Sequence, residues 1–149
     1  IRDVLGSRGL GDVYKRQDQN ITNMNQHHRC LICLGSNHNG VAHLKSAEQE
    51  LEKISSGIHW GNAVETAAED TASSGSYLNR AALMNTTLSK EKLIEEFKKI
   101  ESRHGRTATG KQQGIVPLDI DLLTYDDEIV KPADLKKSYV QQALQSVVQ

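Results

Sequence analysis

The stretch VPLDIDLLTY, residues 116–125, alternates apolar and acidic side chains at its centre. Successive side chains of a β-strand point to opposite faces, and this alternation is typical of a strand whose apolar face is covered by other elements. Three residues share the apolar face, which we expect to lie toward helices: Leu118, Ile120 and Leu122. Asp119 and Asp121 share the opposite face, with side chains about 7 Å apart by strand geometry. A bare carboxylate in such a segment is costly, so both aspartates need a cationic partner.

The nature of that partner stays open on spacing alone. Two carboxylates at i and i+2 on one rigid face suit a pair of Mg²⁺ ions, or Mg²⁺ bridging a polyphosphate. The alternative is a solvated sheet face whose aspartates pair with lysines or arginines, and spacing by itself favours this alternative.

Outward from this strand, the sequence predicts alternating strands and helices. An amphipathic helix follows Gly40, because apolar residues recur at helical spacing: Val41, Leu44, Leu51 and Ile54. Ser89 is a favourable N-cap for a second helix, whose apolar side carries Leu93, Ile94, Phe97 and Ile100. Further strands are expected at residues 30–34, 60–68 and 77–88, and a short helix at residues 133–148.

The resulting order is β-α-β-β-α-β, with the strand at residues 117–124 last. This order predicts an α+β fold of the ferredoxin-like class, a sandwich in which helices pack on one face of a mainly antiparallel sheet. The order alone is compatible with many functions.

The N-terminal segment and the charge balance limit the extent of the domain and the kinds of partner that we expect. Residues 7–17, SRGLGDVYKRQ, resemble the in-frame translation of a sequencing-library adapter. We interpret residues 1–23 as a non-native or disordered extension and Met24 as the native start, which leaves one domain at residues 24–149. Because 19 acidic residues balance 18 basic ones, we expect no nucleic-acid or membrane partner. No apolar run approaches the roughly 20 residues of a membrane span, and we expect a cytoplasmic monomer or homodimer.

Cys30 and Cys33 form a CLIC motif, which could be a redox pair or half of a zinc site. The motif lies in an apolar run that predicts a buried strand, where residues three apart point to opposite faces. The two thiols should therefore not meet, and the sequence holds no second cysteine pair to complete a zinc site. We interpret both cysteines as small buried hydrophobic residues.

Several short sequence blocks follow one another along the chain: LGSN at 34–37, ET at 65–66, YLN at 77–79, IE at 100–101, GR at 105–106 and LDIDLL at 118–123. In this order and at these spacings they resemble the 6-hydroxymethyl-7,8-dihydropterin pyrophosphokinase family of folate biosynthesis. The resemblance covers about residues 30–125. Each block alone is weakly specific, but the ordered set is hard to obtain by chance.

The resemblance implies transfer of pyrophosphate from ATP to the hydroxymethyl oxygen of the pterin, with release of AMP. It implies that Asp119 and Asp121 bind two Mg²⁺ ions and that, with Arg106, they are catalytic residues. The implied pterin-binding residues are Thr66, Tyr77 and Asn79. The implied nucleotide-binding residues are Glu101, Arg106 and Lys111. An asparagine amide offers both a donor and an acceptor to a flat ring, and a guanidinium offers forked donors to phosphate.

The chain departs from the family pattern next to the aspartates. The family has Gly-Pro-Arg before its aspartate strand, whereas this chain has Gly114, Ile115 and Val116, so the arginine is replaced by Val116. The preceding aromatic residue is Gln113, and the family's later Pro-His and arginine have no counterpart in residues 136–149. Three hypotheses follow: a working pyrophosphokinase, a degenerate paralogue that binds nucleotide or pterin without turnover, or an unrelated ferredoxin-like interaction module.

Overall fold

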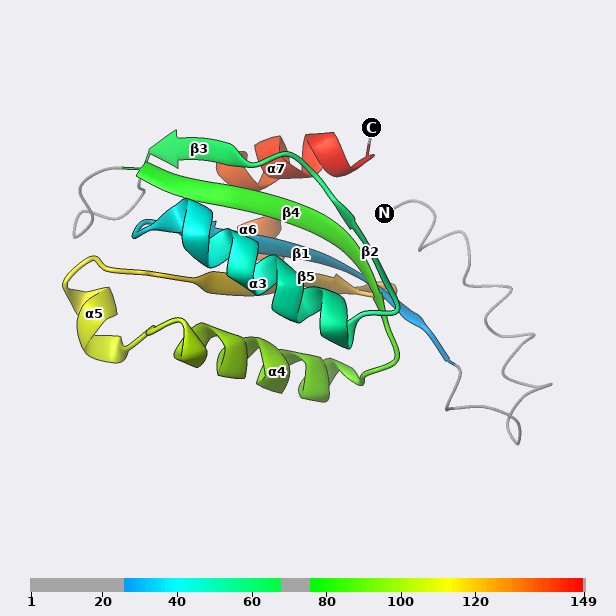
Figure 1. Cartoon of the computed structure of the whole chain (residues 1–149). Coiled ribbons are helices and arrows are strands. Elements are labelled where there is room, and N and C mark those ends of the chain that lie inside the picture. The colour runs from blue at the N-terminus through cyan, green and yellow to red at the C-terminus, as the bar shows by residue number, and fades with distance from the viewer. Residues whose placement is uncertain (1–25, 68–75, 149) are drawn as a thin grey trace.

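The computed structural model describes residues 26–67 and 76–148 of the chain (Figure 1). The interpretation of residues 1–23 as an extension falls outside these residues and stays a prediction. None of the helices in the two described ranges combines the length and the apolar character that a membrane crossing requires.

An antiparallel sheet forms the middle layer of the molecule. Its strands are β1 (His28–Ser36), β2 (Gly57–Trp60), β3 (Val64–Ala67), β4 (Ser76–Thr86), β5 (Asp119–Tyr125) and β6 (Glu128–Ile129). The order across the sheet is β2-β4-β1-β5-β6, and β3 also pairs with β4. The long strand β1 therefore lies at the centre, between β4 and β5.

The strand predicted at residues 60–68 is two short strands, β2 and β3, that both pair with β4. Trp60 lies opposite Ala82 and Val64 lies opposite Asn79. The segment from Trp60 to Val64 therefore advances four residues while β4 advances three. The extra residue breaks the ladder of hydrogen bonds between the two short strands.

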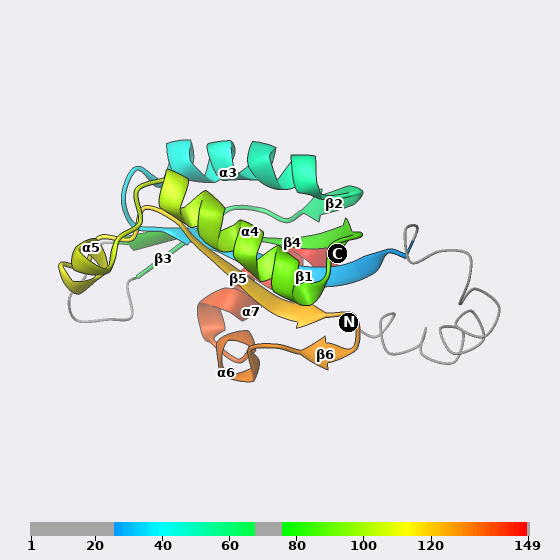
Figure 2. The ribbon, with the colours of Figure 1, turned by 90° about the horizontal axis from the view of Figure 1, so that it is seen from below.

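Two helices cover one face of the sheet, as the sequence predicts. Helix α3 (Gly40–Ile54) lies over β1 and β4, and helix α4 (Lys90–Arg103) lies over β5 (Figures 1 and 2). The hydroxyl group of Ser89 accepts a hydrogen bond of 3.2 Å from the backbone N–H of Lys92, so the predicted N-cap is confirmed. This arrangement confirms the ferredoxin-like α+β class.

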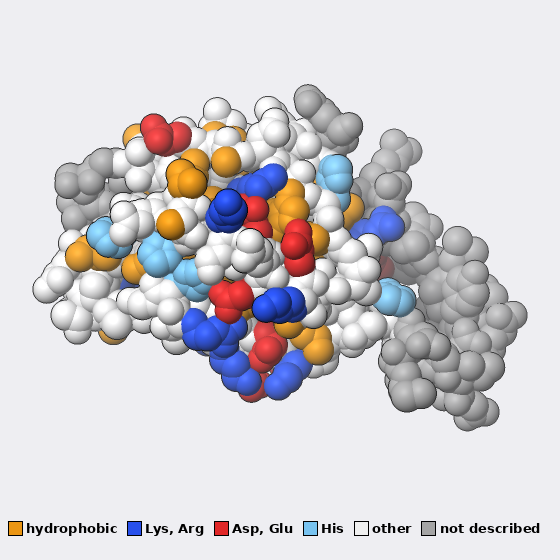
Figure 3. Space-filling model, in the orientation of Figure 1, with side chains coloured by type: hydrophobic (Ala, Val, Ile, Leu, Met, Phe, Trp, Pro, Cys, Tyr) orange, Lys and Arg blue, Asp and Glu red, His pale blue; other side chains and the backbone are white. Residues whose placement is uncertain are grey.

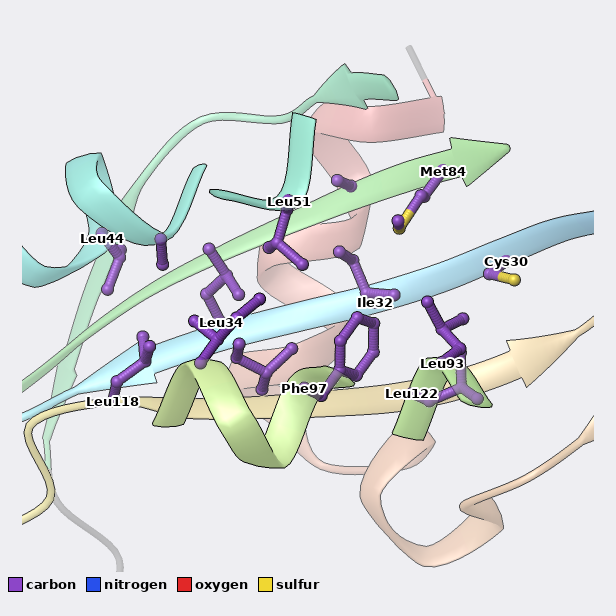
Figure 4. Close-up of a cluster of buried hydrophobic side chains, with 14 residues drawn as sticks. Cys30, Ile32, Leu34, Leu44, Leu51, Met84, Leu93, Phe97, Leu118 and Leu122 are labelled. Carbon is purple, nitrogen blue, oxygen red and sulfur yellow. The ribbon is translucent and has the colours of Figure 1, made fainter. Parts of the chain in front are cut away.

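A hydrophobic core fills the space between these helices and the sheet (Figure 4). The residues that meet there include Ile32, Leu34, Leu44, Leu51, Met84, Leu93, Phe97, Leu118, Ile120 and Leu122. The three apolar residues of the aspartate strand thus face the helices, as predicted. Val41 does not join them: it is 75% exposed, because it lies in the first turn of α3, near the edge of the covered area.

The outer face of α3 and α4 carries charges of both signs at close range (Figure 3). Lys99 lies 3.2 Å from Glu96 within α4. The carboxylate of Glu50 on α3 lies 2.7 Å from Arg103 Nη2 and 2.8 Å from His104 Nε2, so it links α3 to the end of α4. Opposite charges therefore alternate here and give no single-sign field on this face.

The other face of the sheet is partly covered by the C-terminal part of the chain. The helix predicted at residues 133–148 is two helices, α6 (Pro132–Leu135) and α7 (Ser138–Val148). Both lie on the side of the sheet opposite α3 and α4 (Figure 2). A second, smaller core forms under α7 from Leu31, Cys33, Ala81, Leu123, Val140, Ala143, Leu144 and Val147. The central strands are apolar on both faces at this point, so both faces need a cover.

The two cysteines behave as predicted. Cys30 belongs to the core under α3 and α4, whereas Cys33 belongs to the core under α7, so the thiols lie on opposite faces of β1. Both are free and buried, and burial raises the pKa of each thiol to about 12. Neither is a thiolate near neutral pH, which is unfavourable for redox chemistry or metal binding.

Replacing Gly61 with Ala is expected to lower the free energy of unfolding by about 1–3 kcal/mol, the usual cost of overpacking. A Cβ atom there would collide with Ser146 Oγ and lie 2.7 Å from Val147 Cγ2, both on α7. Gly57→Ala is the matched control, because its Cβ atom would lie 3.8 Å from Asn85 Nδ2, an ordinary contact. Urea denaturation of both variants measures the difference in the free energy of unfolding. Equal losses of stability would contradict close packing of α7 against Gly61.

Candidate functional site

A cavity of about 390 Å³ opens on the face of the sheet opposite α3 and α4. Seven of the eight residues predicted from the sequence line it: Thr66, Tyr77, Asn79, Arg106, Lys111, Asp119 and Asp121. They come from β3, β4, β5, the loop after α4 and the short helix α5 (Ala108–Gln112). The fold therefore brings together side chains that are up to 55 positions apart, from 66 to 121.

A row of paired residues crosses the sheet at the floor of this cavity. Gly35 lies opposite Asn79 on one side and opposite Asp119 on the other. A Cβ atom at Gly35 would lie 3.2 Å from Asn79 Oδ1, closer than side chains normally pack. The glycine thus leaves open space above the sheet between an amide and a carboxylate.

The amide end of the row is buried and already ordered. Asn79 is 2% exposed, and its Nδ2 group donates a 2.8 Å hydrogen bond to Thr66 Oγ1. The pairing of β3 with β4 places Thr66 opposite Tyr77, so both lie on the cavity face with Asn79. This end of the cavity offers polar groups fixed on two strands, and such fixed groups orient small ligands in binding pockets.

The carboxylate end carries two ion pairs. Arg106 Nη1 lies 2.5 Å from Asp119 Oδ1, and Lys131 Nζ lies 2.7 Å from Asp121 Oδ1. Both aspartates also line the cavity. The two alternatives that spacing left open are therefore combined in the ligand-free chain: the aspartates face a cavity, and cationic side chains neutralise them.

The two carboxyl groups differ in their affinity for protons. Burial and the negative charge of Asp119 raise the pKa of Asp121 from 3.8 to about 7. Burial also opposes ionisation of Asp119, but hydrogen bonds to Asp121 and Arg106 lower its pKa overall. A further cation bound between the two would favour the fully ionised pair.

These donors fit Mg²⁺. The ion prefers carboxylate oxygens and is commonly held by one or two carboxylates, water and the phosphates of a substrate. Within residues 26–67 and 76–148, no group of three or more His, Cys, Asp or Glu side chains is arranged to hold a metal. Asp119 and Asp121 are therefore suited to an ion whose shell a phosphate ligand completes, and not to a closed protein cage.

Glu101 does not line the cavity, but it contacts two segments that do. Its Oε2 atom accepts a 2.8 Å hydrogen bond from the backbone N–H of Ile120 and lies 3.2 Å from Arg106 Nη1. Burial raises the pKa of this carboxyl group. Glu101 thus holds the guanidinium of Arg106 against the start of β5, a role that sequence reasoning did not predict.

Asn37, the last residue of the LGSN block, holds the loop that precedes the aspartate strand. Its Oδ1 accepts a 2.7 Å hydrogen bond from the N–H of Val116, and its Nδ2 donates to the carbonyl of Gly114 at 2.6 Å. Val116 is 6% exposed and lines the cavity. The sequence block signalled this position, but only the structure reveals what it binds.

Lys131 lines the cavity although the sequence analysis did not predict it as a site residue. The hairpin of β5 and β6 pairs Tyr125 with Glu128 across a two-residue turn, and this register brings the chain after β6 back beside Asp121. The two aspartates between Tyr125 and Glu128 are typical of a hairpin turn, and a predicted hairpin here would have indicated this position. Lys131 therefore belongs to the cavity although it lies ten residues beyond Asp121.

Comparisons with known proteins show a matching family and two similar proteins. Residues 31–149 match a family model described as 7,8-dihydro-6-hydroxymethylpterin-pyrophosphokinase (HPPK). A mitochondrial folate synthesis bifunctional protein of Pisum sativum is 31% identical over 128 residues, which are 83% of this chain and 24% of that protein. A folate synthesis bifunctional protein of Chlamydia trachomatis serovar D is 50% identical over 52 residues, which are 35% of this chain and 11% of that protein. The chain thus spans a quarter or less of the length of these curated relatives.

Proposed function

Because the chain belongs to the 7,8-dihydro-6-hydroxymethylpterin-pyrophosphokinase family, we propose that it transfers a pyrophosphoryl group from ATP to the hydroxymethyl oxygen of 6-hydroxymethyl-7,8-dihydropterin. AMP is the second product, and the reaction serves folate biosynthesis in the cytoplasm. The observation that carries the proposal is the meeting of the predicted pterin-binding and phosphate-binding residues in one cavity. Family membership argues against an unrelated ferredoxin-like interaction module.

In this proposal the pterin binds at the amide end of the cavity. Asn79 and Thr66 read the edge of the ring, and Tyr77 packs beside it. The hydrogen bond between Asn79 and Thr66 orders the amide before the ligand arrives, which reduces the entropy lost on binding. The hydroxymethyl group then points along the row of Gly35 toward Asp119.

The triphosphate binds at the carboxylate end. Arg106, held by Glu101, and Lys111 bind phosphate oxygens and align the β-phosphorus with the hydroxymethyl oxygen. Asp119 and Asp121 would hold two Mg²⁺ ions, which supply neutralisation of the charge that develops on the phosphates. Correct alignment and charge neutralisation contribute most of the rate enhancement in such transfers.

The direct test measures AMP release by the purified chain with ATP, Mg²⁺ and 6-hydroxymethyl-7,8-dihydropterin. AMP and the pyrophosphorylated pterin are expected in equal amounts, and each should require all three additions. Release of AMP that does not depend on the pterin would contradict the proposal.

One observation favours a second candidate, a protein that binds nucleotide or pterin without turnover. Val116 occupies the cavity wall where the family has an arginine, and loss of one cation that stabilises a transition state can cost several kcal/mol. Binding of Mg²⁺-ATP and pterin in calorimetry, together with absence of AMP release, would support this candidate over the first.

Asn79→Ala is expected to weaken pterin binding about 10- to 100-fold, because a buried polar edge of the ligand loses its partner. Isothermal titration calorimetry with the pterin measures this change. Asn85→Ala is the matched control, since Asn85 is on the same strand and outside the cavity. Unchanged pterin affinity in Asn79→Ala, with normal circular dichroism, would remove Asn79 from the site.

A further inference from the structure

Lys131 is placed at the cavity by its backbone. It follows β6 and precedes α6. Its N–H donates to the carbonyl of Leu123 at 3.3 Å, and its own carbonyl accepts from the N–H of Leu135 at 3.0 Å. The backbone is therefore fixed from both sides, while the side chain remains 43% exposed and keeps a flexible four-carbon stem.

The ammonium group of Lys131 occupies the position where a cation is needed next to Asp121. Its Nζ atom lies 2.7 Å from Asp121 Oδ1, within the lining of the cavity. The same carboxylate is one of the two that the proposed function assigns to Mg²⁺. A divalent ion bound at that oxygen would repel an ammonium at this distance, so both cannot occupy it together.

An ammonium displaced from Asp121 still lies in the field of Asp119 and Asp134, and a phosphate ligand in the cavity gives it a further anionic acceptor. Val116 also lines the cavity and provides no charge for such a ligand. A lysine acts as a point charge toward phosphate and needs no fixed orientation, so a short movement of its stem is sufficient.

We propose, on the basis of the proposed function, that Lys131 is a phosphate-binding residue that pairs with Asp121 in the ligand-free chain and moves to the triphosphate when Mg²⁺-ATP binds. The lysine neutralises Asp121 before the ligand arrives. It then contributes to the triphosphate site a positive charge that the cavity wall at Val116 does not supply.

The test compares the full chain with its Lys131→Met variant in isothermal titration calorimetry, with Mg²⁺ alone and then with Mg²⁺-ATP in the absence of pterin. Loss of the competing ammonium should tighten the binding of Mg²⁺ alone several-fold. Loss of a charged phosphate contact should weaken Mg²⁺-ATP binding about 10- to 100-fold. Changes of opposite sign for the two probes are the expected result.

Two further variants control the experiment. Lys136→Met removes a lysine that is exposed at the end of α6 and lies outside the cavity, and it should alter neither affinity. Lys131→Arg keeps a cation and should restore most of the affinity for Mg²⁺-ATP.

The outcomes separate this inference from the proposed function. If the parent chain binds Mg²⁺-ATP but Lys131→Met binds it equally well, Lys131 does not bind phosphate and the inference is overturned alone. Weaker Mg²⁺-ATP binding without tighter binding of Mg²⁺ overturns the exchange between Asp121 and phosphate. A parent chain that does not bind Mg²⁺-ATP overturns the proposed function and this inference together.

Discussion

Replacement of Arg106 with Met is expected to lower the free energy of unfolding by about 2–3 kcal/mol at pH 8 and to reduce turnover strongly. The guanidinium lies 2.5 Å from Asp119 and 3.2 Å from Glu101. Removal of one partner from a buried ion pair costs about 3–5 kcal/mol. The side chains of Asp119 and Glu101 are 34% and 15% exposed, so water reduces the cost here.

The loss of stability in Arg106→Met should depend on pH. Without the guanidinium, the folded-state pKa of Asp119 and of Glu101 rises, so the folded variant binds protons more tightly than the unfolded chain. A raised carboxyl pKa costs stability at high pH, and the cost disappears as pH falls below the folded-state pKa. The difference from the parent should therefore be smaller at pH 5 than at pH 8.

Urea denaturation at both pH values measures this difference, and Arg106→Lys is the control. A lysine keeps the charge and should recover most of the stability. It should recover less of the turnover, because an ammonium lacks the forked donors that fit phosphate. An equal loss of stability at both pH values would attribute the effect to packing of the side-chain stem and contradict the electrostatic account.

The parts of the fold that the sequence predicts correctly depend on local periodicity. Alternation along β5 separates Leu118 and Ile120 from Asp119, and the same rule separates Cys30 from Cys33 on β1. The cap at Ser89 is likewise a local hydrogen bond. These features follow from backbone geometry within a few residues, so one segment at a time is enough to predict them.

The parts that the sequence does not predict depend on contacts between distant segments. The division of residues 60–68 into β2 and β3 follows from pairing with β4, and α7 packs on the second face because β1 is apolar on both. Val41 has the correct spacing for the buried side of α3, yet it is 75% exposed. Periodicity gives the direction of a side chain but not how far the opposite layer extends.

In the candidate site, too, the residues that were predicted differ from those that were not in how far their roles depend on distant contacts. Seven predicted residues line one cavity because the family resemblance carries long-range information that spacing lacks. Glu101 and Lys131 both contact the first part of β5. Glu101 reaches Ile120 from α4, and Lys131 reaches Asp121 from the segment after the hairpin. Their roles depend on how these elements pack, which neither the sequence blocks nor the periodicity specify.

Asp119→Asn and Asp121→Asn are each expected to reduce turnover by about 10²-fold or more, because each removes a carboxylate ligand charge at the proposed Mg²⁺ site. Their effects on the metal-free protein should have opposite signs. The pKa of Asp119 is lowered in the folded chain, so its ionised form stabilises the fold above its unfolded-state pKa, and Asn loses that contribution. The pKa of Asp121 is raised to about 7, so its ionised form costs stability at pH 8.

Asp121→Asn should therefore match or exceed the stability of the parent at pH 8, by on the order of 1–2 kcal/mol, with the gain reduced because Lys131 loses its partner. The gain should shrink as pH falls from 7 toward 4, where the parent carboxyl group is protonated in the folded state. Asp119→Asn should be less stable than the parent at pH 8, since Arg106 loses its 2.5 Å ion pair with Asp119 and keeps the longer 3.2 Å contact with Glu101. Urea denaturation with EDTA, and again with Mg²⁺-ATP, measures both variants. If both lose stability without metal, yet Mg²⁺-ATP stabilises them as much as the parent, the aspartates are structural ion-pair partners and the Mg²⁺ site is wrong.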